Sequence, residues 1–210
     1  MRALVAAVLL LVATVATASE VGLSGAEGHP RARFPLAVQA APLGHAALDA
    51  AIWRAVDDWN VVAREVLGVQ VFVRGEHPSR CHVTIAVEPR AASGRMGETF
   101  METGADGVIA CPVRIVVAEP SSRGQTAAET LLYQVVAHEL GHALGLAHTR
   151  DPRSLMCCIH GSVDFTDPTA REAYVEARRH PDLHSVSGQL RAHYDRFWSG
   201  QAGARTPSDR

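Results

Sequence analysis

The stretch AHELGHALGLAH, residues 137–148, constrains this chain more than any other part of its sequence. His138 and His142 are four residues apart, so on a helix both imidazoles lie on one face, separated by about one turn. Two imidazoles at that separation can reach a single zinc ion. Glu139 follows the first histidine, where its carboxylate can take a proton from a zinc-activated water. The pattern predicts a helix that carries two metal ligands and a general base.

A catalytic zinc site uses three protein ligands and keeps its fourth position open. Gly145 lies three residues after His142 and can adopt the left-handed conformation that ends a helix and turns the chain. His148 can then approach the metal from another direction. A lone H-E-x-x-H could be a solvated helical face, but the full H-E-x-x-H-x-x-G-x-x-H arises by chance far less often. We predict Zn²⁺ as cofactor, His138, His142 and His148 as its ligands, and Glu139 as the catalytic residue.

Met156 follows His148 in the context Ser-Leu-Met. Core packing alone could explain a methionine there. Its position after the third histidine instead favours the methionine turn that marks the metzincins, in which this side chain forms an apolar floor beneath the ligands.

The N-terminus has the composition of a secretory signal peptide. Arg2 precedes an apolar run, and the small-residue site Ala-Thr-Ala ends at Ala18. The run is too short to cross a bilayer comfortably, so a membrane anchor is the less favoured reading. Cleavage after residue 18 leaves a chain of ordinary single-domain size. The net charge of −2 does not suggest a nucleic-acid partner.

Alternating and helical patterns divide the rest of the chain. We predict a signal peptide at 1–18, a flexible arm at 19–33, a catalytic domain at 34–199 and a disordered tail at 200–210. The sequence predicts strands within 33–42, 69–75, 81–89 and 96–117, and helices at 45–67, 127–144, 167–179 and 187–198. Apolar residues recur at helical spacing in the first helix and alternate in 81–89. Thr126 and Glu129 have the spacing of a capping box, which predicts the start of the second helix.

Four cysteines, Cys81, Cys111, Cys157 and Cys158, allow three pairings in an oxidising compartment. We favour Cys81–Cys111, which could bridge two predicted strands. A bond between the adjacent Cys157 and Cys158 would be strained, so their state stays open. A zinc-ligand role for either is disfavoured because three histidines already suffice.

Taken together, the helix AIWRAVDDWN, the strand CHVTIAV, the segment MGET…DGVIACPVRIVV and the motif HELGHALGLAHTRDPRSLM resemble the matrixin-type metzincins, in particular their small bacterial members. The resemblance covers roughly residues 34–180 and is most specific in the last segment. It assigns zinc to His138, His142 and His148, and the general base to Glu139. Matrixins often have Tyr-Pro after the turn methionine, where this chain has Cys157-Cys158, so the resemblance does not define its specificity.

The resemblance implies an α+β zincin fold. We expect a twisted mixed sheet, a long N-terminal helix, a catalytic helix and a small helical C-terminal subdomain. An extended peptide would pair with the edge strand within 96–117. The expected protein is a monomeric zinc metalloendopeptidase that acts on protein or peptide substrates, is secreted or periplasmic, and has no stable membrane insertion.

Three histidines outside the motif can be explained without a role in the metal site. His180 and His184 share the four-residue spacing, but Pro181 interrupts the helix between them, so we expect them to be solvated. His160 could assist a substrate, although a surface loop is the simpler interpretation.

Two functions of other classes remain open. One is a catalytically silent, zinc-stabilised extracellular binding protein of the same fold. The other is an anchored partner-recognition domain that retains its N-terminal segment. Glu139 argues against the first, because a purely structural zinc site needs no base.

Overall fold

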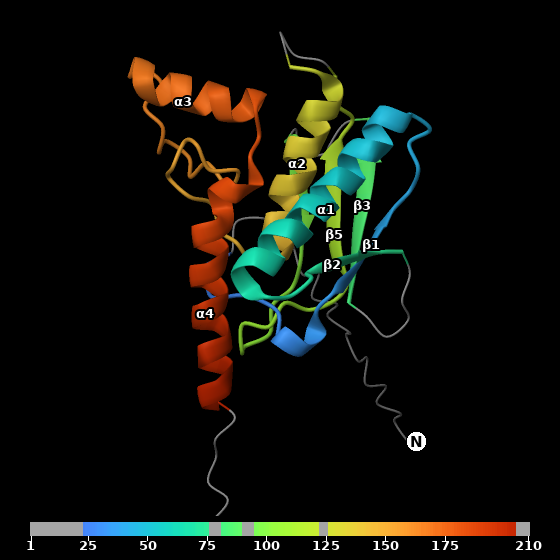
Figure 1. Ribbon diagram of the computed structural model, residues 1–210, viewed down its shortest axis with the longest axis vertical. Helices are drawn as coiled ribbons and strands as arrows, with labels where there is room; N and C mark the ends of the chain where they lie inside the picture. The colour runs from blue at the N-terminus through green and yellow to red at the C-terminus, as the bar shows by residue number, and fades with distance from the viewer. Residues whose placement is uncertain (1–22, 76–80, 90–94, 122–125, 205–210) are drawn as a thin grey trace, which may run out of the picture.

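The computed structural model describes residues 23–75, 81–89, 95–121 and 126–204. The predicted signal peptide and its cleavage site lie outside these residues. Within them, a five-stranded sheet is covered by two helices, and further helices follow toward the C-terminus (Figure 1). The expected α+β zincin-like fold is confirmed.

The sheet has the order β2-β1-β3-β5-β4. Strands β2, β1, β3 and β5 are parallel, and β4 pairs with β5 in the antiparallel direction. This places β4 at the end of the sheet as described, within the segment expected to supply the edge strand. The strands are β1 Leu36–Ala40, β2 Phe72–Arg74, β3 His82–Glu88, β4 Gly97–Phe100 and β5 Val113–Ala118.

Helices α1 (Ala46–Leu67) and α2 (Ala128–Ala143) lie side by side against the sheet (Figure 1). Apolar residues at helical spacing give α1 one buried face. Trp59 on that face is fully buried and donates its indole N–H to the Ala137 carbonyl of α2, at 2.9 Å. Helix α1 ends at Gly68, as its sequence predicted. The buried face of α1 therefore fixes the position of the helix that carries the motif.

The start of α2 differs from the capping-box prediction. Ala127 occupies the N-cap, and no side chain caps the helix there. A capping box requires its threonine at the N-cap and its glutamate three residues later. Because the helix begins at Ala128, Thr126 precedes the N-cap and Glu129 comes one position too early in the helix.

The predicted disulfide is present: Cys81 and Cys111 are bonded, with a Cα–Cα distance of 5.3 Å. The bond joins the residue before β3 to the segment that leads into β5. These two strands are neighbours in the sheet, so the bond reinforces a contact that their backbone pairing already makes.

The C-terminal part is helical, as expected. It comprises α3 (Pro168–Arg179), a short 3-10 helix (Leu183–Val186) and α4 (Ser187–Ala204). Helix α4 contacts α1, which runs at an angle to it, while α3 lies beyond the opposite end of the short 3-10 helix with few neighbours (Figure 1). Helix α4 also continues into the segment expected to be a disordered tail, of which 205–210 lie outside the described residues.

The described part of the expected flexible arm, residues 23–33, packs against the domain. Gly28 forms a backbone bridge with Val108, and the side chain of His29 is fully buried. The His29 Nε2–H donates to the Ala143 carbonyl at the end of α2, at 2.9 Å. This part of the segment is attached to the domain by burial and backbone pairing.

Candidate metal centre

The three predicted zinc ligands come together at one point. His138 and His142 lie on α2, and His148 follows the turn after it. Their Nε2 atoms are separated by 3.0 Å for His138–His148 and by 3.1 Å for each of the two pairs that include His142. Ligand nitrogens at about 2.0–2.1 Å from a tetrahedral zinc ion lie roughly 3.3 Å apart. The spacing of these nitrogens therefore fits one zinc ion.

Gly145 makes this convergence possible. Its φ of +88° is the left-handed conformation predicted for it, and a Cβ at this position would overlap the carbonyl of Glu27. The chain reverses here and returns His148 toward α2. Glycine is needed both for the backbone conformation and for the close approach of the N-terminal segment.

Backbone carbonyls set the orientation of two ligand rings. The Nδ1–H of His138 donates to the Leu155 carbonyl and that of His142 donates to the Leu146 carbonyl, each at 2.8 Å. A neutral imidazole that donates from Nδ1 presents a lone pair at Nε2. His138 and His142 thus direct lone pairs toward the shared point, which is the donor set that a metal cation requires.

The histidines are neutral at physiological pH. Burial lowers the pKa of His138 to about 4 and that of His142 to about 3, and it also lowers the pKa of His148. Positive charge adds to this, from Arg178 on His138 and from Arg95 on His148. Metal binding needs deprotonated ligands, so the site does not have to release protons to bind a cation at neutral pH.

Met156 packs against the helix that carries two of the ligands. Its side chain is fully buried, and its sulfur packs against Gly141 of α2, between the first two histidines. The Thr149 N–H donates to the Met156 carbonyl at 2.9 Å, which ties the turn to the residue after His148. The turn therefore supports the third ligand as well as the helix.

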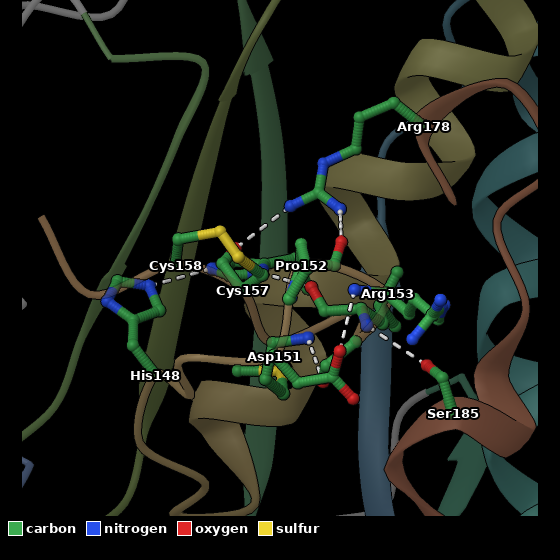
Figure 2. The surroundings of a disulfide bond; sticks show 12 residues. His148, Asp151, Pro152, Arg153, Cys157, Cys158, Arg178 and Ser185 are labelled. Atoms are coloured by element: carbon green, nitrogen blue, oxygen red, sulfur yellow. Dashed lines mark hydrogen bonds between the residues drawn. A yellow bond between two sulfur atoms is a disulfide. The ribbon is translucent and has the colours of Figure 1, made fainter. Parts of the chain in front are cut away.

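The adjacent cysteines lie beside this site. The structure joins Cys157 and Cys158 in a disulfide, with His148 to one side of the pair (Figure 2). Arg178 of α3 points toward the same loop and donates to the carbonyls of Cys157, at 3.2 Å, and Pro152, at 3.4 Å. This guanidinium links α3 to the methionine turn.

Glu139 has a buried carboxylate, with the residue only 2% exposed. The Thr99 hydroxyl of β4 lies 2.6 Å from its Oε2. No sequence motif marks Thr99. Strand alternation puts it on the same face as Gly97, but only the packing of β4 on α2 shows that this face meets Glu139.

The other histidines considered from sequence do not join the centre. His160 is exposed. His180 lies near Glu176, and His184 near Glu65 and Asp182, all as exposed surface pairs. In the described part of the chain, three residues form a group that could hold a metal ion: His138, His142 and His148.

The fold and the triad define a zincin-type protein. Residues 36–167 match the Matrixin family, which is more than half of the chain, so this chain belongs to the matrixin family. A shorter match aligns 36 residues with macrophage metalloelastase of Oryctolagus cuniculus, at 50% identity. It covers 17% of this chain and 8% of that protein, a small part of its length. Membership suggests a zinc metalloprotease.

Proposed function

We propose that this protein is a zinc-dependent endopeptidase that cleaves protein or peptide substrates outside the cytoplasm. The observation that carries the proposal is the convergence of three neutral imidazoles beside a buried carboxylate. A purely structural zinc site is closed by four protein ligands, whereas three ligands with an adjacent base are typical of a catalytic site.

His138, His142 and His148 would hold the metal, with the first two rings oriented by the Leu155 and Leu146 carbonyls. Zinc, when bound, supplies a Lewis acid for the scissile carbonyl and lowers the pKa of water at the site. The chain keeps the ligand rings in place through its methionine turn and the turn at Gly145. It leaves one position for water and substrate because no fourth protein ligand faces the triad among the described residues.

Glu139 would act as general base and then as general acid. Its carboxylate would take a proton from the attacking water and pass it to the nitrogen of the leaving amine. Burial favours this role, because a carboxylate in a dry site is held in one position and interacts strongly with the developing charges.

The substrate would bind as an extended strand along β4. This strand ends the sheet in the described chain, and its backbone groups offer the main-chain pairing used in strand addition. Main-chain pairing depends little on the side chains of the substrate. Contacts beside the metal, including those of the Cys157–Cys158 loop, would therefore decide cleavage-site preference.

The predicted signal peptide and the Cys81–Cys111 disulfide support an extracytoplasmic enzyme, which we propose acts as a monomer. None of the helices in the described chain has the length and apolar character required to cross a membrane.

The test is cleavage of casein, an unstructured protein, by the zinc-loaded chain starting at Ser19. Glu139→Ala should retain about one zinc per chain and lose kcat by about 10²–10⁴-fold. Glu129→Ala, on an exposed position of the same helix, is the matched control and should retain both zinc and activity. Removal of zinc by a chelator should abolish cleavage, and added zinc should restore it.

The outcomes separate the alternatives. Full zinc with no cleavage by parent or variant would support the silent binding protein. Low zinc in both would refute the metal site itself. An exported protein whose intact mass still includes residues 1–18 would support the anchored recognition domain.

A further inference from the structure

Strand β4 contacts the proposed general base through a buried threonine. Thr99 is 2% exposed, and its hydroxyl lies 2.6 Å from Oε2 of Glu139 and 3.1 Å from the backbone oxygen of the same residue. A hydroxyl has one proton to donate. Both of these acceptors belong to Glu139, so the hydroxyl binds this residue in either arrangement.

The distances favour the carboxylate as acceptor. Hydrogen bonds from a hydroxyl to an ionised oxygen are typically about 2.5–2.7 Å long and roughly twice as strong as neutral ones. The 2.6 Å contact falls in this range, whereas the backbone contact at 3.1 Å is long for a hydroxyl donor. Thr99 therefore holds the end of the Glu139 side chain rather than only its backbone.

Gly97, two residues earlier on the same face of β4, provides the space for this carboxylate. A Cβ at Gly97 would lie 2.5 Å from Oε1 of Glu139 and 2.6 Å from Cγ1 of Val135. Any side chain there would displace the carboxylate. The strand thus provides a hydrogen-bond donor for one oxygen of the Glu139 carboxylate. Because Gly97 has no side chain, it also leaves room for the other oxygen.

We propose that Thr99 is a positioning residue that fixes the Glu139 carboxylate for proton transfer, and that Gly97 makes room for it. The inference rests on the proposed function, in which Glu139 is the general base. The same strand would pair with the extended substrate. Because one short strand would hold both partners, the distance between base and scissile bond would be set within β4 itself. Preorganisation of this kind acts on the chemical step more than on binding.

The test compares Thr99→Val, which removes the hydroxyl at nearly constant volume, with Thr99→Ser, which keeps it. Thr99→Val should lower kcat on casein by about 10- to 100-fold with zinc content and KM near those of the parent. Thr99→Ser should recover most of the lost kcat. The matched control is Thr84→Val on β3, which removes a half-buried hydroxyl that faces the Val113 carbonyl at 3.5 Å. It should leave kcat unchanged.

Two results would overturn the positioning role alone. One is that the parent cleaves casein and the Thr99→Val variant cleaves it with the same kcat. The other is an equal loss of kcat in Thr99→Val and Thr99→Ser. Only Thr99→Ser keeps the hydroxyl, so equal losses would mean that the hydroxyl is not what matters. An inactive parent with one zinc per chain would instead overturn the proposed function, and the positioning role with it.

A double-mutant cycle on urea unfolding examines the contact itself. Thr99→Val should lower the midpoint less in a Glu139→Ala background than in the parent, because the carboxylate partner is already absent. Equal shifts in the two backgrounds would overturn the proposed hydrogen bond.

Discussion

Helices α2 and α3 are built in opposite ways. Nine residues of α2 are buried, including Glu139 and His142, whereas none of the residues of α3 is buried. Helix α3 has strong local signals instead: Asp167 accepts the Thr169 N–H at 2.9 Å, and Pro168 stands in the first turn. Helix α2 lacks a side-chain N-cap altogether.

The end of α2 is completed by residues far away in the sequence. His29 donates to the Ala143 carbonyl, and the Tyr194 hydroxyl donates to the Leu144 carbonyl at 2.9 Å. The last carbonyls of a helix have no partner within the helix, so outside donors stabilise them. The helix that carries the proposed site is thus held by the tertiary structure, and α3 mainly by its own sequence. This difference suits a site whose ligands must not move.

The largest expected effect is loss of packing in α2. Leu132 is fully buried one turn after the start of the helix, so Leu132→Ala should lower the free energy of unfolding by about 2–5 kcal/mol. The matched change in α3, Val175→Ala at a residue that is 38% exposed, should cost less than about 0.5 kcal/mol. Urea unfolding measures both. Similar costs would contradict the comparison.

The turn after α2 should be the next most sensitive point. Gly145→Ala forces a side chain into a left-handed conformation, which costs about 1–3 kcal/mol before any overlap with Glu27 is counted. The variant should also bind less zinc, because the same turn brings His148 to the site. Gly188→Ala, in α4 with open space around it, is the control and should not destabilise the protein. Full zinc binding by Gly145→Ala would show that the turn is not required.

The buried His29, which donates to the end of α2, should make the stability of the protein depend on pH. Burial, the largest cause, lowers the pKa of His29 to about 4 from an ordinary value of 6.5, and the nearby Arg33 and His193 lower it further. Above pH 6.5 the ring is neutral in both states. As pH falls toward 4 the unfolded chain takes up the proton first, so the stability contributed by neutral His29 is lost across that range.

The variant His29→Phe should remove this part of the pH dependence. Its free energy of unfolding should be about 0.5–1.5 kcal/mol below that of the parent at pH 7, because the bond to Ala143 is lost. Between pH 6.5 and 4 the difference between the two proteins should shrink and then reverse, because the lowered pKa of His29 costs the parent more stability than the lost bond costs the variant. The control His184→Gln, at an exposed histidine, should follow the parent throughout. A constant difference would contradict the assigned titration.

The most local effect is expected at the cap of α3. Asp167→Ala should cost about 1 kcal/mol locally, seen as faster hydrogen exchange of amides in the first turns of α3. Exchange in α2 should not change. Equal loss of protection in both helices would mean that α3 is coupled to the site more strongly than the hydrogen bonds of Arg178 indicate.

What could be read from the sequence depended on local geometry. Helical spacing put His138 and His142 on one face, and a glycine marked the turn to His148. Apolar periodicity located α1, and Pro168 marked the first turn of α3. These inferences succeed because an element's period and ends depend on neighbouring residues. The Cys81–Cys111 bond was also predictable, since both cysteines lie next to strands.

The tertiary structure alone decided the contacts between distant residues. Thr99 meets Glu139 across 40 positions, and His29 meets Ala143 across 114. Neither residue carries a local signal, and the capping box at Thr126 was a local signal that the fold did not use. The sequence by itself determined which residues could form the metal centre. Only packing determined what holds that centre still, because the free energy of burial depends on which surfaces meet and not on where they lie along the chain.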